Sequence, residues 1–161
     1  MGAHGVLNNC TMTVDSTDFR IPQKGAATKG KAFASHKYAG KSTLGYKLGV
    51  DILAGNLVWI QGPYPAGKFT DIKNFNKVLR NFLEPGERVE ADEGYRGLPD
   101  KIKCPGNDAN PAENRAMQGR VRARHETLNG RLKNWGILSQ VYRHDIMKHG
   151  DVFRACTAAR W

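Results

Sequence analysis

Apolar and polar residues alternate over several short stretches of the chain, which is the spacing of β-strands. This spacing predicts a first strand at residues 11–21 and a second at 44–52, followed by a short apolar run at 57–60. A Gly-Asn pair separates the last two and favours a hairpin between them. A fourth strand is predicted at 88–92, shortly after a Pro-Gly turn.

Three other segments have the spacing of α-helices. A helix is predicted to begin at Thr70 as its N-cap and to place five apolar side chains on one face, namely Ile72, Phe75, Leu79, Phe82 and Leu83. A long helix is predicted at 113–135, with Gly136 ending it, and its apolar stripe consists of Met117, Val121, Leu128, Leu132 and Trp135. A final helical segment is predicted at 145–160. The whole pattern is typical of a mixed α/β domain.

Length and composition agree with one globular domain over 1–161. The 161 residues are 40% hydrophobic, which is enough for a single core. No apolar run reaches the length of a membrane span, and no signal peptide is recognisable, so we expect a soluble intracellular protein without a membrane partner. The three cysteines are widely spaced, which excludes a disulfide framework and a cysteine-rich zinc site.

The chain is strongly basic, which favours a polyanionic partner such as DNA. Lys and Arg number 25 against 15 Asp and Glu, a net charge of +10. Between Arg115 and Lys148 there are eight basic residues and two acids, so this excess surrounds the long helix. Arg122, Arg124 and Lys133 are the candidate DNA contacts, although Arg124 falls nearer the apolar stripe, where a structural role is equally consistent.

Three acids stand where a two-metal phosphoryl-transfer site would need carboxylates. Asp15 lies in the first predicted strand, Asp92 at the end of the fourth, and Glu126 on the long helix, roughly opposite its apolar stripe. Hard divalent cations prefer carboxylate oxygens, and two ions about 4 Å apart can serve both the attacking and the leaving oxygen of a phosphodiester. Three such acids therefore favour a nuclease.

Four motifs in this order resemble the DDE superfamily endonucleases of PIF/Harbinger-type transposases, over about residues 14–153. The motifs are Val-Asp-Ser-Thr-Asp-Phe-Arg-Ile (14–21), Gly67-x-x-x-Asp71, Ala-Asp-Glu-Gly-Tyr (91–95) and Arg-x-Arg-His-Glu-x-x-Asn-x-Arg-Leu-Lys (122–133). The resemblance implies a ribonuclease-H-like α/β fold, with a mixed sheet flanked by helices. It also implies two Mg²⁺ ions, or Mn²⁺ in their place, held by Asp15, Asp92 and Glu126.

The implied activity is cleavage of DNA phosphodiesters and, in a complete enzyme, transfer of the 3′-hydroxyl end to target DNA in the nucleus. Ser16 departs from the family's usual Gly beside the first acid. Such transposases carry a DNA-binding segment before the nuclease domain, whereas only thirteen residues precede Val14, so we expect that segment to be absent from 1–161. A separate DNA-binding protein and a homo-oligomer on DNA are therefore candidate partners.

Two alternatives stay open. The first is that the chain is a domesticated or truncated remnant of a transposase, which binds DNA or a protein without cutting. The second concerns further residues of the site. Asp71 fits a capping role in the first helix as well as a direct role, and His125 could orient a ligand, contact DNA, or be a packed or surface imidazole.

Overall fold

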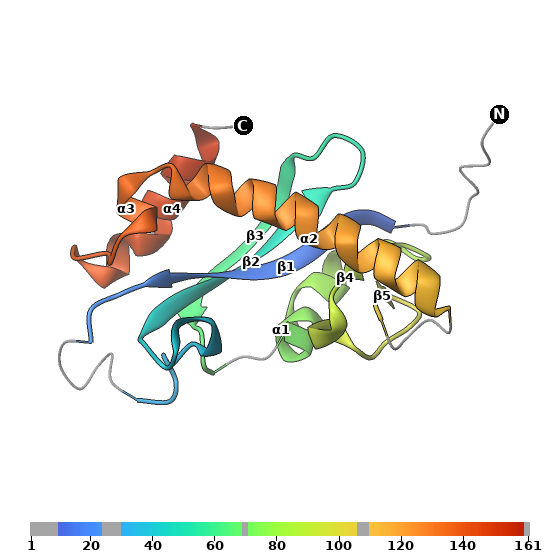
Figure 1. Cartoon of the computed structure of the whole chain (residues 1–161), viewed down its shortest axis with the longest axis horizontal. Helices are drawn as coiled ribbons and strands as arrows, with labels where there is room; N and C mark the ends of the chain where they lie inside the picture. The colour runs from blue at the N-terminus through green and yellow to red at the C-terminus, as the bar shows by residue number, and fades with distance from the viewer. Residues whose placement is uncertain (1–9, 24–29, 69–70, 106–109, 160–161) are drawn as a thin grey trace.

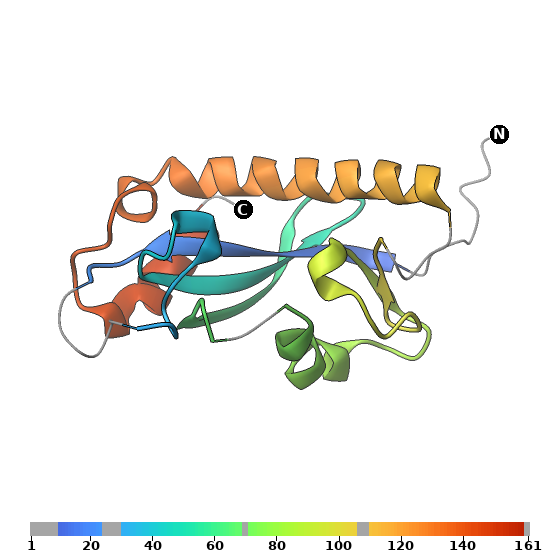
Figure 2. The ribbon, with the colours of Figure 1, turned by 60° about the horizontal axis from the view of Figure 1, so that its bottom comes forward.

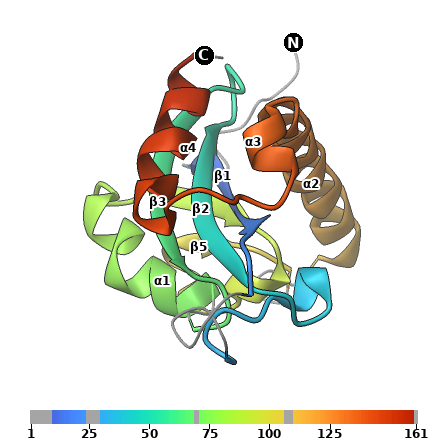
Figure 3. The same cartoon turned by 90° about the vertical axis from the view of Figure 1, so that its left-hand side faces the viewer.

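The computed structural model describes residues 10–23, 30–68, 71–105 and 110–159, and it forms one mixed sheet with helices on both faces (Figure 1). Helices α2 and α1 lie on opposite sides of the sheet (Figure 2), and the C-terminal helix α4 lies beside β2 and β3 (Figure 3). This architecture confirms the predicted ribonuclease-H-like α/β class.

The strands follow the order β3-β2-β1-β4-β5, so the first strand of the chain is the central one. β1 pairs antiparallel with β2 and parallel with β4; β2 and β3 are antiparallel, and β4 and β5 are parallel. The bounds are Cys10–Arg20 for β1, Thr43–Asp51 for β2, Leu57–Pro65 for β3, Arg88–Ala91 for β4 and Ile102–Lys103 for β5.

The helices are α1 (Asp71–Lys77), α2 (Pro111–Lys133), α3 (Gly136–Ser139) and α4 (His149–Ala158). Short 3₁₀ turns lie at His36–Tyr38 (η1), Leu79–Phe82 (η2), Glu93–Tyr95 (η3) and Ile146–Lys148 (η4).

The core has two main parts because strand side chains alternate between the two faces of the sheet. Val14 of β1 belongs to the cluster on the α1 side, which includes Phe75. Phe19 of β1 belongs to the cluster under α2 and α4, which includes Leu128 and Phe153. β1 therefore presents even-numbered positions near its centre to α1 and odd-numbered positions to α2.

The four predicted strands are confirmed with small shifts of their ends, and β3 continues five residues beyond the predicted run, to Pro65. β5 was not predicted, because two residues are too few to show an alternation. The predicted final helical segment corresponds to η4 and α4.

The prediction for the first helix was partly wrong. α1 ends at Lys77 and the chain continues as the 3₁₀ turn η2, which has about three residues per turn rather than 3.6. A helix face calculated with 3.6 residues per turn is therefore no longer accurate near the end of this segment. Leu79 and Leu83 are buried, but Phe82 is 72% exposed. Thr70, the predicted N-cap, lies outside the described residues.

The long helix forms as predicted, but its ends differ. Asn110 is the N-cap and accepts hydrogen bonds from the backbone N–H groups of Ala112 and Glu113, so α2 begins at Pro111. The helix ends at Lys133 because Trp135 adopts an extended conformation. Gly136 does not end α2 but begins the short helix α3, which corrects the role predicted for it.

Candidate active site

Asp15 and Asp92 are brought together by the parallel pairing of β1 and β4. Val14 pairs with Ala91 in the last register position of this pair, so each acid is the next residue of its own strand. Neighbouring strands lie about 4.8 Å apart. Two acids that are 77 positions apart in the sequence thus stand side by side where β4 leaves the sheet.

The two carboxylates influence each other electrostatically. The pKa of Asp92 is raised, first by burial and then by the negative charge of Asp15. The backbone N–H of Gly94 opposes this shift, because it donates a 3.0 Å hydrogen bond to Asp92 Oδ1. Asp15 Oδ1 accepts a 2.7 Å hydrogen bond from the N–H of Ser16. A pair of partly buried, mutually repelling carboxylates is chemically suited to a divalent cation.

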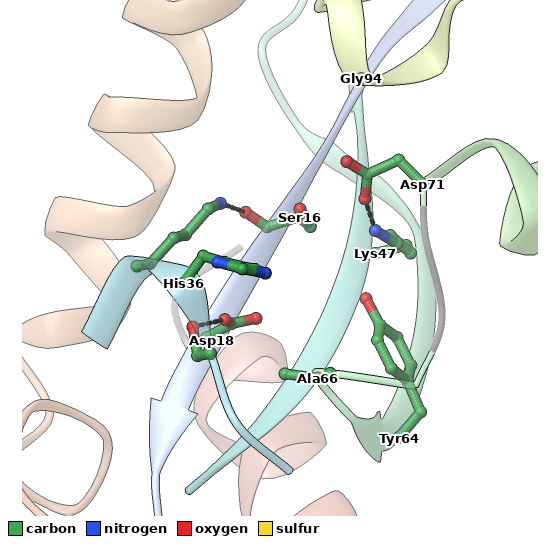
Figure 4. A pocket seen from close by; sticks show the side chains of 11 residues that line it. Ser16, Asp18, His36, Lys47, Tyr64, Ala66, Asp71 and Gly94 are labelled. Carbon is green, nitrogen blue, oxygen red and sulfur yellow. Dashed lines mark hydrogen bonds and ion pairs between the residues drawn. The ribbon is translucent and has the colours of Figure 1, made fainter. Parts of the chain in front are cut away.

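A pocket of about 380 Å³, whose lining side chains are drawn in Figure 4, is lined by Ser16 and Gly94, which lie next to Asp15 and close to Asp92 in the sequence; neither Asp15 nor Asp92 lines it. It lies on the α1 side of β1 and is polar, with both acids and bases in its wall. The lining residues are Ser16, Asp18, Ser35, His36, Lys37, Lys47, Tyr64, Ala66, Gly67, Asp71 and Gly94.

Lys47 is the buried cation of this pocket, with only 3% of its surface exposed. It forms an ion pair with Asp71, the first residue of α1, and the two side chains point toward each other in Figure 4. Its pKa is lowered to about 8, first by burial and then by the charge of Lys37, while the acids Asp15, Asp18 and Asp92 act in the opposite direction.

Gly94 connects the pocket to Asp92. A Cβ at this position would lie 2.8 Å from Asp71 Oδ2 and 3.1 Å from Asp92 Oδ1. The carboxylates of Asp71 and Asp92 therefore both lie close to Gly94, and a larger residue at this position would have to displace them. Asp71, which sequence analysis left between a capping role and a site role, lies next to Asp92.

Glu126 is carried by a different element from the other two acids, the long helix α2. It lies on the exposed face of α2, whereas Met117, Val121, Leu128 and Leu132 are buried, as the spacing of the apolar stripe predicted. α2 itself contacts β1 and β4, the strands that position Asp15 and Asp92. Within the described ranges, no group of three or more His, Cys, Asp and Glu side chains is close enough to hold a metal ion.

His125 is a packed imidazole, 2% exposed, on the sheet-facing side of α2. It makes a hydrogen bond to the backbone of Thr13, and burial lowers its pKa although the charge of Asp15 acts to raise it. His125 therefore anchors α2 on β1, two residues from the first acid.

The three predicted DNA contacts divide into two kinds. Arg122 and Lys133 are exposed on α2. Arg124 is partly buried, donates a 3.3 Å hydrogen bond to the carbonyl of Ile52 and lies 3.8 Å from Glu90 Oε2. Arg124 thus holds the helix on the sheet.

Sequence reasoning missed Lys47 and Glu90. Both occupy predicted strands, and alternation alone does not say what covers the polar face. Helices cover both faces of this sheet, and Glu90 is 5% exposed. A strand followed by a helical segment on each side is the signal that could have found them, because it indicates a sheet buried on both faces.

In the part of the chain that the structure describes, no helix is both long and apolar enough to cross a membrane.

Comparison with known proteins places the chain in a family. No curated protein matches it. A family model described as a transposase DDE domain matches residues 9–160, which is nearly the whole chain. This match includes both strands of the acid pair, the pocket and all of α2. The chain therefore belongs to the transposase DDE domain family.

Proposed function

We propose that the chain is the catalytic domain of a metal-dependent DNA endonuclease and transposase, with Asp15, Asp92 and Glu126 as its metal-binding acids. Family membership supports the general class, a nuclease or transposase that acts on DNA with divalent metal ions. The observation that carries the proposal is the placement of Asp15 beside Asp92, where the charge of one raises the pKa of the other.

The donor set fits hard divalent cations. Asp15 would contact two ions, Asp92 would hold one and Glu126 the other, with Mg²⁺ as the natural metal and Mn²⁺ as a substitute. When bound, such ions supply activation of a water or a terminal hydroxyl and stabilisation of the leaving oxygen. The resemblance to PIF/Harbinger-type transposases supports transfer of the 3′-hydroxyl end in a complete, nuclear enzyme.

The chain's own contribution to DNA binding would come from α2. Arg122 precedes Glu126 by one helical turn and Lys133 follows it by two, so the two cations lie on the same exposed side and are about 16 Å apart along the axis. Cations spaced in this way can contact several phosphates of one strand and position it along Glu126. Because Arg124 has partners inside the protein, we retain Arg122 and Lys133 as the phosphate contacts.

A second function has one observation in its favour. Among the described residues, no group of three or more His, Cys, Asp and Glu side chains is close enough to hold a metal ion. A remnant that keeps the fold and the basic helix but binds DNA without cutting would have this arrangement. Such a domain would bind DNA with strong salt dependence.

A plasmid-nicking assay distinguishes the two functions. With Mg²⁺ or Mn²⁺, the wild-type chain should nick DNA, and Asp92→Asn should reduce the rate by about 100-fold or more, because charge stabilisation of this kind contributes about 10²–10³ in rate. Asp100→Asn, at an exposed turn, is the matched control and should nick normally.

Binding of labelled DNA should be measured in the same samples. DNA binding without any metal-dependent nicking by the wild type would favour the remnant. Nicking that survives Asp92→Asn would remove Asp92 from the site.

A further inference from the structure

We infer that Lys47 is a positioning residue of the proposed metal site: its buried ammonium is the counter-ion of the surrounding carboxylates and limits how tightly they bind divalent cations. This inference rests on the proposed function, since it concerns the same acids. It assigns a role to the side of the site that faces α1, opposite the helix that carries Glu126.

On its face of β2, Lys47 is a long side chain between two glycines. Its neighbours on the same face of the strand are Gly45 and Gly49. A Cβ at Gly45 would lie 2.7 Å from the ring of Tyr64, and a Cβ at Gly49 would lie 2.7 Å from Met12 Sδ. Neighbouring side chains thus fill the space beside the strand, and Lys47 alone extends from it into the pocket.

The ammonium of Lys47 is held by groups from three elements. Asp71 at the start of α1 is its ion-pair partner. The ring centroids of Tyr64 on β3 and Tyr95 in η3 lie 5.7 Å and 5.6 Å from Nζ, within the range of cation–π attraction. Tyr95 follows Asp92 by three residues and lies in the turn that Asp92 caps. The residues that surround Lys47 therefore include the turn next to the second acid.

The charge of Lys47 reaches the acid pair. Lys47 pairs with Ser16 in the β1–β2 register, next to Asp15. The charges of Asp15, Asp18 and Asp92 each favour the protonated lysine, as the direction of their effects on its pKa indicates. Asp71 also shares the space over Gly94 with Asp92. One buried cation is therefore electrostatically coupled to four carboxylates.

Such a cation has two opposite effects on the site. It reduces repulsion among the acids when no metal is bound, and it repels a divalent ion that approaches them. Removing its charge should therefore strengthen metal binding while weakening the metal-free fold. A lysine with a purely structural role would affect only the fold.

The test is calorimetric titration of the full chain with Mn²⁺, without DNA, for the wild type, Asp92→Asn, Lys47→Met and Lys47→Arg. Lys47→Met should bind Mn²⁺ at least about tenfold more tightly, because even in the high dielectric of water one unit charge several ångströms from a divalent ion has an effect of this order. Lys47→Arg keeps the charge and should stay near the wild-type affinity.

Lys103 offers a matched control. It is also 3% exposed, lies in the same sheet on β5, and pairs with Glu113 at 2.8 Å. Lys103→Met should lower thermal stability, as Lys47→Met does, but leave the affinity for Mn²⁺ unchanged. If Lys47→Met does not fold, Asp71→Asn serves as the second variant: it leaves Lys47 without its ion-pair partner and should weaken Mn²⁺ binding about threefold or more.

The outcomes separate this inference from the proposed function. A wild type whose Mn²⁺ binding is absent, or is unaffected by Asp92→Asn, overturns both. Binding that depends on Asp92 but has the same affinity in Lys47→Met overturns the role of Lys47 alone, and so does an equal gain in Lys103→Met.

Discussion

Lys47 and Glu90 are charged side chains that are buried between the sheet and a helix, and each forms ion pairs with residues of that helix. Lys47 meets Asp71 of α1, whereas Glu90 meets Arg120 and Arg124 of α2. Burying a charge is unfavourable unless it is paired, so these contacts fix the helices relative to the strands that carry Asp15 and Asp92.

Gly94 is a residue at which a small substitution would act directly on the carboxylates of the site. Its backbone does not need glycine, since its φ is not in the left-handed region, but a Cβ would collide with the carboxylates of Asp71 and Asp92. Gly94→Ala should therefore displace Asp92 and reduce nicking and Mn²⁺ affinity at least about tenfold, as expected for loss of groups that orient a metal ligand.

Gly119→Ala is the control for this substitution. Gly119 lies on the exposed face of α2, where a new Cβ meets nothing within 4 Å. Alanine there should raise the free energy of unfolding by up to about 1 kcal/mol and leave Mn²⁺ affinity unchanged. Equal metal affinity in Gly94→Ala and the wild type would mean that Asp92 is not a ligand in its present position.

Helix α2 and strand β4 are joined by Glu90. Its carboxylate oxygens lie 3.6 Å from Arg120 and 3.8 Å from Arg124, and Arg124 also reaches the carbonyl of Ile52 beyond the end of β2. One acid thus links the strand that leads to Asp92 with the helix that carries Glu126.

Glu90→Gln should loosen this junction. Loss of the charge leaves the partly buried Arg124 without an anionic partner at that site, so the free energy of unfolding should fall by about 1–3 kcal/mol. The measurement is urea denaturation, with Glu93→Gln, an exposed neighbour, as the control. A change below about 0.5 kcal/mol, the range of ordinary surface substitutions, would show that the link does not hold α2.

The positions of the strands and helices were predicted more reliably from the sequence than the burial of their side chains. Alternation found β2 and the apolar stripe found α2, because both signals repeat over several turns or residue pairs, whereas β3 was found from a short apolar run after a Gly-Asn pair. Phe82 was misplaced because a 3₁₀ turn breaks the helical period, and Lys47 was missed because alternation does not reveal a helix on the second face. Asp15 and Asp92 could be proposed from motifs, but their contact required the parallel pairing of β1 and β4.

The C-terminal part of the molecule closes the core with an aromatic cluster that contains a buried histidine. His149 is 0% exposed, packs against Phe19 and Tyr142, and its Nδ1 is 2.6 Å from the hydroxyl of Tyr46. Burial lowers its pKa from 6.5 to about 4. The folded protein therefore keeps His149 neutral at pH values where the unfolded chain takes up a proton.

Stability should consequently depend on pH in a defined window. The contribution of neutral His149 is fully present above pH 6.5 and is lost progressively as the pH falls to about 4, by up to about 3 kcal/mol. Urea denaturation at several pH values should show this loss in the wild type and in His36→Gln, an exposed histidine. His149→Gln should be less stable at neutral pH but should lose less on acidification; an unchanged pH dependence would contradict the assignment.

The central position of β1 also matters while the chain is being synthesised. β1 leaves the ribosome before its parallel neighbour β4, which follows about seventy residues later. Until then a nascent chain can complete the hairpin side of β1 but leaves the other edge of the strand, beside Asp15, unpaired. Open edges of this kind pair readily with other chains. Fragments that end before residue 88 should therefore aggregate, and the acid pair can assemble only after β4 has been made.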